Sequence, residues 1–427
     1  MASNIKQNLR ILIEEWQKRP PPLIKPRELK IDKWFRDEGI NKIVSVVGFR
    51  RCGKTFLLLD FAQRKGKDNC LYLNLEDERL PKTTEVLTEL TNVIKEYYGA
   101  KKIFLLLDEI QEIPLWSRWA RRVNETGLYN LVLSGSSSKL SSAEIPTELR
   151  GRTVTETVFP LSYFEFRDWR GLDGPLLLRE YLAYGGFPEI VLADVGKKAL
   201  LLDEYFQTFL TRDIFERYKI RQQQAMGDLI RLLIASPYYT FGKLGTTLKT
   251  AGYEIGKGTV AKYLSYLTSS FFLRPLEIHT AKVKSRIQHP KKSYFTDTFF
   301  LSRAGNFSEN FGRLMEEAVA GYYFRQRLSD PNFDFYYWKD VAGREVDFVL
   351  RKSQRVEKLV QVSCIHSAME INERELVALE RASDELGCHN LSLITWDYDG
   401  VIKRKNKEIR CLPLIGFFDS VRNDVFS

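Results

Sequence analysis

The pattern of apolar and polar positions divides the first part of the chain into alternating strands and helices. Apolar residues recur at helical spacing over residues 4–18, and this run ends at Pro20, Pro21 and Pro22. Short runs rich in β-branched residues and leucine predict five strands, at residues 43–47, 70–75, 103–107, 130–133 and 153–159. Buried runs of this length between helices are typical of a parallel sheet covered on both faces. We therefore predict an α/β core.

The turn after the first strand carries the clearest chemical motif. Residues 48–55 read G-F-R-R-C-G-K-T and fit the pattern G-x-x-x-x-G-K-[ST] between a strand and a helix. In such a loop the glycines let backbone N–H groups close on a phosphate, Lys54 reaches the outer phosphates and the Thr55 hydroxyl is a ligand for Mg²⁺. The candidate nucleotide-binding residues are Gly48, Arg50, Arg51, Cys52, Gly53, Lys54, Thr55 and Phe56.

The third strand ends in two acids, Asp108 and Glu109. At the carboxyl end of a buried parallel strand, Asp108 can hold Mg²⁺ through water, and Glu109 can orient and deprotonate an attacking water. An apolar strand that ends in solvated acids is common by itself. The prediction therefore depends on the phosphate loop that precedes the strand.

Two further groups of polar residues follow the third strand. Ser134 or Ser136, after the fourth strand, is the candidate polar sensor near the γ-phosphate; the alternative is that these serines cap a helix predicted over residues 139–149. Arg150 and Arg152 come after that helix. At a subunit edge either one could reach a neighbour's γ-phosphate as an arginine finger. The alternative is a pair at a helix C-terminus, stabilised by the helix dipole.

Composition adds limited constraints. Lys and Arg outnumber Asp and Glu by 65 to 55 in 427 residues, which permits an anionic partner such as nucleic acid without requiring one. The five cysteines form no C-x-x-C pair, so neither a disulfide framework nor a zinc cluster is indicated, as suits a reducing cytoplasm. No apolar run approaches the roughly 18 residues of a membrane span, and the N-terminus lacks the features of a signal peptide. We predict a soluble, cytoplasmic protein.

The middle of the chain predicts a helical lid and a winged helix. Helical spacing over residues 177–219 is consistent with a lid over the nucleotide. Three helices at 226–235, 241–251 and 257–267, then strands at 271–278 and 293–296 joined by a basic connection, predict the winged helix. Such a fold places its third helix in the major groove of DNA and its wing on phosphates. The alternatives are a protein-docking module and a solvated lysine-rich loop.

The last part of the chain resembles the PD-(D/E)xK nuclease fold. A helix at 315–327 is followed by strands at 333–338, 345–350 and 358–364, and a helix at 370–386 and strands at 391–396 and 408–418 complete an α/β sandwich. Glu317, Asp347 and Gln361 are the candidate Mg²⁺ site residues. Ser363 stands where that fold has its lysine, and no other lysine is clearly placed to substitute. We expect a non-catalytic remnant that docks DNA or is purely structural.

Several ordered segments together resemble one family. They are GFRRCGKT, LEDERL, LLLDEIQEIPLWSRWARRV, LVLSGSSSKLSSAEIPTELRGR, VFPLSYFEF, YGGFPEIV and KKSYFTDTFFL. They resemble the prokaryotic and archaeal AAA+ ATPases that are fused to a C-terminal region of poorly defined function. The resemblance implies ATP binding and Mg²⁺-dependent hydrolysis on a five-stranded core, with Gly48, Lys54, Thr55, Asp108 and Glu109 in the roles given above.

The sequence therefore predicts a multidomain α/β protein that does ATP-driven work on DNA, such as translocation, remodelling or branch migration. The predicted domains are an N-terminal helix and linker (1–40), an AAA+ core (41–170), a helical lid (171–221), a winged helix (222–300) and a nuclease-like domain (301–427). A homo-oligomer, with a hexameric ring as one arrangement, follows if an arginine acts in trans. The alternatives are a nucleotide-switched regulatory or defence ATPase that acts on a protein partner, and an ATP-dependent DNA nuclease.

Overall fold

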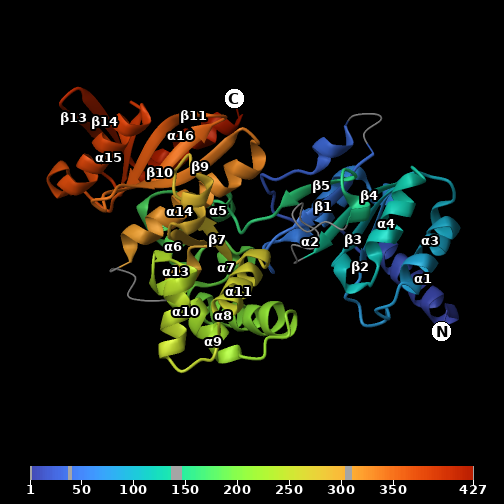
Figure 1. Cartoon of the computed structure of the whole chain (residues 1–427). Coiled ribbons are helices and arrows are strands. Elements are labelled where there is room, and N and C mark those ends of the chain that lie inside the picture. The colour runs from blue at the N-terminus through green and yellow to red at the C-terminus, as the bar shows by residue number, and fades with distance from the viewer. Residues whose placement is uncertain (1, 37–40, 136–146, 303–309, 427) are drawn as a thin grey trace. The chain divides into compact units, whose positions relative to one another are not determined.

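The computed structural model describes residues 2–36, 41–135, 147–302 and 310–426. The chain forms two compact units: Met1–Pro160 with Ser269–Phe271, and Leu161–Thr268 with Phe272–Ser427. We call them unit 1 and unit 2; their elements are labelled in Figure 1. In the described parts of the chain no helix is long and apolar enough to cross a membrane. The finer domain boundaries given by the sequence stay predictions.

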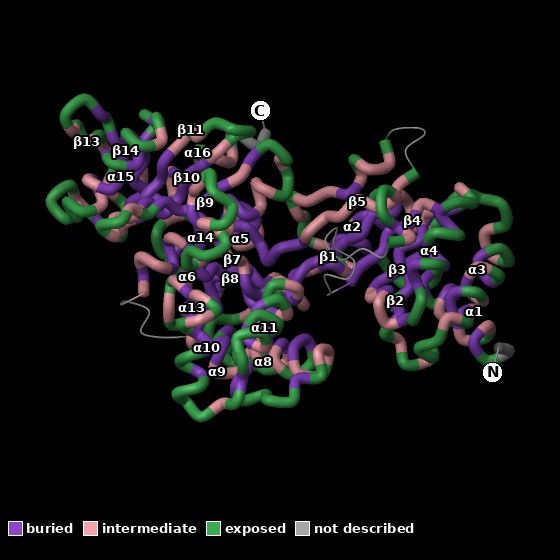
Figure 2. Tube along the Cα trace, in the orientation of Figure 1, coloured by how far each residue is buried: buried purple, intermediate pink, exposed green. Residues whose placement is uncertain are grey.

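Unit 1 is built on a parallel sheet of five strands in the order β2-β3-β4-β1-β5. The strands are β1 (Ile43–Val47), β2 (Cys70–Asn74), β3 (Ile103–Asp108), β4 (Tyr129–Gly135) and β5 (Thr153–Thr157). Figure 2 shows β1, β3 and β4 as mostly buried, as expected for apolar strands covered on both faces. The sequence prediction of five parallel strands is confirmed.

The helices of unit 1 are α1 (Ala2–Lys18), α2 (Lys54–Lys65), α3 (Glu85–Tyr98) and α4 (Trp116–Glu125). Short 3₁₀ helices lie at Asp32–Phe35, Lys67–Asn69, Ile110–Glu112 and Thr147–Leu149. The helix predicted at residues 139–149 lies mostly outside the described residues, and its last three residues form a 3₁₀ turn rather than an α-helix.

Unit 2 begins with helices and then adds a small antiparallel sheet. Its helices before the sheet are α5 (Tyr163–Arg170), α6 (Pro175–Tyr184), α7 (Pro188–Leu192), α8 (Val195–Thr208), a π-helix (Phe209–Glu216) and α9 (Gln223–Ala235). The sheet region contains β6 (Tyr238–Tyr239), α10 (Phe241–Thr250), α11 (Lys257–Ser269), β7 (Leu273–Leu276), α12 (Val283–Gln288), β8 (Lys291–Phe295) and α13 (Phe299–Ser302). The three strands have the order β6-β8-β7. The predicted helices of this region are present, and the basic connection carries α12.

The C-terminal part of unit 2 is a six-stranded mixed sheet in the order β13-β14-β12-β11-β10-β9. Its elements are α14 (Phe311–Ser329), β9 (Phe333–Lys339), β10 (Glu345–Lys352), β11 (Arg355–Val362), α15 (Glu373–Leu386), β12 (Leu391–Thr395), β13 (Gly400–Arg404), β14 (Lys407–Pro413) and α16 (Leu414–Phe426).

The prediction of a strand at residues 408–418 is wrong for the second half of that range. The strand ends at Pro413, and α16 begins at the next residue. Leu414, Phe417 and Phe418 are buried, and their spacing of three and four residues places them on one face of a helix.

Candidate functional site

The phosphate loop is a tight turn that requires glycine. Gly48 has φ +151°, and a Cβ atom there would lie 2.1 Å from the carbonyl oxygen of Val158. Gly53 has φ +100° and comes directly before α2. Because the first N–H groups of a helix have no acceptor within it, the loop and the start of α2 present backbone donors to an anion. The two glycines of the motif are therefore explained by the backbone.

Lys54 lies at the mouth of this loop and is only 5% exposed. Its Nζ donates to the carbonyl oxygens of Gly48, at 3.2 Å, and of Phe49, at 3.1 Å. These carbonyls hold the ammonium over the loop, in position to interact with a phosphate bound by the same backbone.

Asp108 is the centre of a hydrogen-bond group at the end of β3, and it is 1% exposed. The Thr55 hydroxyl donates to its Oδ2 at 2.6 Å, the Tyr72 hydroxyl donates to the same oxygen at 2.9 Å, and the Ser134 hydroxyl donates to its Oδ1. Asn74 of β2 is opposite Asp108 in the strand register, and this pairing brings Tyr72 close. Burial and the neighbouring Asp108 raise the pKa of Tyr72, so its hydroxyl stays a donor.

The donor set fits a hydrated Mg²⁺ ion. Thr55 and Asp108 supply a hydroxyl and a carboxylate within hydrogen-bond distance of each other, and Mg²⁺ prefers such oxygen ligands together with water. The sequence named both residues. It did not name Tyr72, and no motif points to a tyrosine at this position.

Glu109 follows Asp108 with φ +53°, in the left-handed region. Its Oε2 accepts a hydrogen bond from Gln111 at 2.5 Å, and its backbone N–H donates to Ser134 Oγ at 3.3 Å. Burial raises the pKa of nearby Glu76, and the charge of Glu109 adds to this rise. Glu76 therefore belongs to the electrostatic surroundings of Glu109.

Four further predicted nucleotide-binding residues lie in the phosphate loop or on the first turn of α2. Arg50 is half-buried, Arg51 is exposed with φ +63°, and Cys52 is fully buried in the loop. Phe56 is 53% exposed on the first turn of α2. Ser134 contacts the site through its hydrogen bond to Asp108, and Ser136 lies outside the described residues.

Arg150 and Arg152 lie at the end of the sheet where β1 and β5 begin, and the phosphate loop lies at the end where β1 stops. Thr153 pairs with Ile43 at the start of two parallel strands, whereas the loop follows Val47 at their other end. The four residue steps from Ile43 to Val47 span roughly 13 Å. Arg152 is 41% exposed and its Nη2 lies 3.4 Å from Glu125 Oε1. Within unit 1 the structure does not bring these arginines to the nucleotide site.

A sequence-distant residue fastens the phosphate loop. Arg27, in the linker after α1, donates through Nη1 to the carbonyl oxygen of Cys52 and through Nη2 to that of Phe159, both at 2.9 Å. Arg27 thus joins the loop to the segment after β5. It lies outside every motif, and the sequence analysis missed it.

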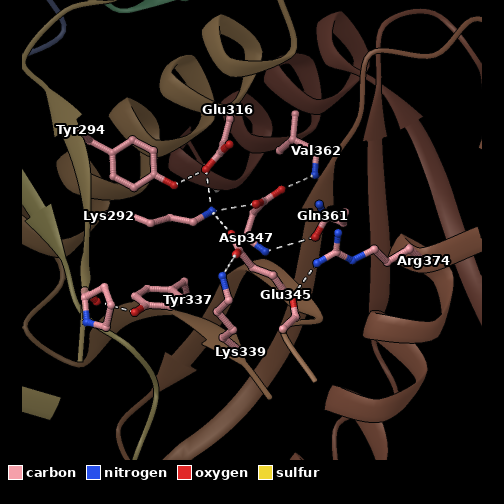
Figure 3. A network of polar contacts seen from close by, with 12 residues as sticks. Lys292, Tyr294, Glu316, Tyr337, Lys339, Glu345, Asp347, Gln361, Val362 and Arg374 are labelled. Atoms are coloured by element: carbon pink, nitrogen blue, oxygen red, sulfur yellow. Dashed lines mark hydrogen bonds and ion pairs between the residues drawn. The ribbon is translucent and has the colours of Figure 1, made fainter. Parts of the chain in front are cut away.

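A second group of charged side chains lies in unit 2 (Figure 3). Lys292 of β8 has its Nζ 2.8 Å from Glu316 Oε1, 2.8 Å from Glu345 Oε1 and 2.8 Å from Asp347 Oδ1. We call Glu316, Glu345 and Asp347 the acid cluster. The backbone N–H of Asp347 donates to Gln361 Oε1 at 3.2 Å. Burial, with a smaller contribution from Glu316, raises the pKa of Asp347 to about 7 although Lys292 lowers it.

The structure brings Asp347 and Gln361 together, and it places the predicted glutamate elsewhere. Glu317 is not at the cluster: its Oε1 accepts the backbone N–H of Phe295 at 2.7 Å, and burial raises its pKa well above the usual range. The glutamate at the cluster is Glu316. The acids also have a lysine beside them that the sequence analysis did not name, because Lys292 reaches them from a distant strand. Within the described ranges, no group of three or more His, Cys, Asp and Glu side chains is placed to hold a metal ion.

Comparisons with known proteins match three successive parts of the chain. A family model described as "AAA domain" matches residues 40–167. Models of two domains of unknown function, DUF8612 and DUF4143, match residues 176–310 and 311–412. The chain is 33% identical to the uncharacterized protein MJ1544 of Methanocaldococcus jannaschii over 384 residues, which are 85% of this chain and 84% of that protein.

A second relative and one solved structure are more distant. An uncharacterized protein of Haemophilus influenzae is 27% identical over 340 residues, 75% of this chain and 82% of that protein. The Walker-type ATPase PABY2304 of Pyrococcus abyssi is similar with a TM-score of 0.45 and 14% identity, over 64% of this chain and 93% of that chain.

Proposed function

The chain belongs to the family of the Methanocaldococcus jannaschii protein MJ1544 and carries an AAA domain, and we propose that it is a Mg²⁺-dependent ATPase that couples ATP hydrolysis to work on DNA. The observation that carries the ATPase part is the convergence of Thr55, Tyr72 and Ser134 on Asp108, beside the phosphate loop.

Each residue of this site has a chemical task in hydrolysis. The loop N–H groups and Lys54 bind the phosphates. Thr55 and Asp108 would hold Mg²⁺, which offsets phosphate charge when bound. Glu109 orients the attacking water and accepts its proton while the bond between the γ-phosphorus and the bridging oxygen breaks. The hydrogen bonds from Gln111 and to Ser134 position Glu109 for that task.

The DNA part of the proposal is supported by the arrangement of β6 to β8. The order helix, strand, two helices, strand, connection and strand, with the sheet order β6-β8-β7, supports the assignment of a winged helix. The helices α10 and α11 contain no acidic residue. Four of their residues are exposed lysines: Lys243, Lys249, Lys257 and Lys262. A basic helix surface without acids is suited to the phosphates of a DNA groove.

The position of Arg152 supports a homo-oligomer. The arginine lies at the amino edge of the sheet, away from its own phosphate loop, and is partly exposed. It can therefore complete a nucleotide site only in a neighbouring subunit, as an arginine finger does. A ring of subunits satisfies this requirement.

DNA binding tests the second part of the proposal. Changing both Lys257 and Lys262 to Ala is expected to weaken binding to labelled duplex DNA about tenfold or more and to lower the salt slope by about 2. Lys197→Ala, which removes a lysine that is 73% exposed on α8, is the matched control and should bind like the wild type. Equal affinity and slope in the double variant would exclude this helix as the DNA contact.

A further inference from the structure

The acid cluster resembles a divalent-metal site in its composition, but a side chain lies at its centre. We propose that the Lys292 ammonium takes the place of the divalent cation, so that the cluster is an ion clamp that joins β8 to the C-terminal sheet and neither binds metal nor cleaves DNA. The proposal does not depend on the ATPase activity of unit 1. Figure 3 shows Lys292 pointing among the acids.

The first support is the geometry around the nitrogen. One oxygen each from Glu316, Glu345 and Asp347 lies 2.8 Å from Nζ. An ammonium has three N–H donors and no acceptor, so these three contacts use its full donor capacity. Three carboxylate oxygens from α14 and β10 therefore surround one cation, and that cation is the Lys292 ammonium.

The second support is that the carboxylates have further partners. Asp347 Oδ2 accepts the backbone N–H of Val362 at 3.0 Å, and Glu345 Oε2 lies 3.2 Å from Lys339 Nζ. The hydroxyl of Tyr294 donates to the Glu316 oxygen that also contacts Lys292. A metal ion would therefore have to displace an ammonium and compete with these donors for the same oxygens.

The third support is burial. The Lys292 side chain is 3% exposed and that of Asp347 is 7% exposed. A buried ammonium is strongly disfavoured unless it is paired and hydrogen-bonded, and the acid cluster supplies that pairing. A nuclease site must instead admit a phosphodiester and a metal ion to the carboxylates. The two central groups here are closed to both.

The consequence concerns how the parts of unit 2 are held together. Lys292 belongs to β8 of the small sheet, while Glu345 and Asp347 belong to β10 and Glu316 to α14. The clamp therefore ties the proposed DNA-binding region to the C-terminal sheet through one group of charges. Ser363 in place of the nuclease lysine is consistent with a cluster that has this structural task.

The test measures Mn²⁺ binding to the full chain by electron paramagnetic resonance. We compare the wild type, Asp347→Asn, Lys292→Ala and Lys292→Ala combined with Asp347→Asn, which all keep the same nucleotide site. The wild type and Asp347→Asn should bind equal numbers of Mn²⁺ ions. Lys292→Ala should gain one site, because three carboxylates then face a vacated cation position, and the double variant should lose that site again.

Thermal melting gives a second readout. Lys292→Ala should melt at a lower temperature than the wild type, and Mn²⁺ should restore part of the difference while leaving the wild type unchanged. Lys291→Ala is the matched control, since Lys291 pairs with Glu277 at 2.8 Å outside the cluster. It should match the wild type in its Mn²⁺ stoichiometry and in the response of its melting temperature to Mn²⁺.

Three results would overturn the proposal. The first is a Mn²⁺ site in the wild type that disappears in Asp347→Asn. The second is Mn²⁺-dependent DNA cleavage by the wild type that Asp347→Asn abolishes. The third is a folded Lys292→Ala that gains no site. If Lys292→Ala does not fold, the comparison of wild type with Asp347→Asn still decides between an ion clamp and a metal site.

Discussion

The hydroxyl of Thr55 lies 2.6 Å from Oδ2 of Asp108, although the two residues are 53 positions apart in the sequence. This hydrogen bond joins the phosphate loop to the end of β3. Tyr72 of β2 donates to the same oxygen, and Ser134 of β4 donates to the other oxygen. The first turn of α2 and the two strands that flank β3 therefore fix the orientation of one carboxylate.

Tyr72→Phe tests the importance of that orientation. The variant keeps the ring but removes the 2.9 Å hydrogen bond to Asp108. A hydrogen bond to a charged group is worth roughly 1.5–3 kcal/mol, and we expect ATP turnover to fall about tenfold with an unchanged fold. Tyr97→Phe is the matched control, because its hydroxyl contacts the exposed Glu14 away from the site. Turnover equal to that of the wild type in Tyr72→Phe would show that Thr55 and Ser134 are enough to orient Asp108.

Arg152→Ala tests the arginine finger. We expect ATP affinity to stay within about twofold of the wild type and turnover to fall roughly a hundredfold or more, because a finger in trans acts on the transition state. The measurement is ATP binding and steady-state hydrolysis at protein concentrations that permit assembly. The same assay applies to Arg150→Ala.

The control for this pair is Arg121→Ala. Arg121 and Arg152 both pair with Glu125, at 3.0 Å and 3.4 Å. Arg121→Ala and Arg152→Ala therefore each lose an ion pair with Glu125. Only Arg152→Ala also loses the proposed finger, so only that variant should lower ATP turnover. Normal hydrolysis by both Arg150→Ala and Arg152→Ala would remove the argument for a finger.

Gly185→Ala tests the backbone turn in the YGGF segment, residues 184–187. Gly185 has φ +72°, and an added Cβ would lie 1.6 Å from Oδ1 of the buried Asp297. We expect the free energy of unfolding to fall by about 3 kcal/mol or more, measured by urea denaturation. Gly196→Ala, where no atom lies within 4 Å of the added Cβ, should change stability little. A stable Gly185→Ala protein would mean that Asp297 can move.

Asp297 also predicts a pH dependence. Burial raises the pKa of this carboxyl from 3.8 to about 6, although the N–H groups of Gly186 and Phe299 lower it. The folded state therefore holds the proton more tightly than the unfolded state, and this stabilisation is present at low pH and lost as the pH rises through 6. The stability difference between wild type and Asp297→Asn should fall by about 2 kcal/mol between pH 4 and pH 7. A stability difference between the two proteins that stays constant from pH 4 to pH 7 would contradict the raised pKa of Asp297.

Local patterns allowed much of unit 1 to be predicted. The phosphate loop and the acids after β3 have fixed spacing and lie beside apolar strands, so the sequence located Lys54, Thr55, Asp108 and Glu109 correctly on their elements. Tyr72 could not be predicted in this way. Its contact with Asp108 depends on the pairing of β2 with β3 across 36 positions, and no periodic pattern encodes that pairing.

The errors in unit 2 have similar physical causes. Glu316 and Glu317 are adjacent glutamates on α14, and a step of one residue turns a helix by about 100°. The phase of the helix decides which carboxylate reaches the acid cluster. Lys292 lies 55 positions from Asp347 in the sequence. The sequence of a short strand does not show which residues its lysine will contact, because that depends on where the strand packs in the fold. The apolar run at residues 412–418 fits either a strand or a helix, because short runs do not distinguish the two.

The proposed function requires that DNA changes the rate of ATP hydrolysis. The most direct test is steady-state ATP hydrolysis by the full chain with and without single-stranded, duplex and four-way-junction DNA, with Glu109→Gln as the blank. We predict Mg²⁺-dependent turnover that one form of DNA raises several-fold and that Glu109→Gln abolishes. Turnover that no form of DNA changes would contradict the claim and would favour a nucleotide switch that acts on a protein partner.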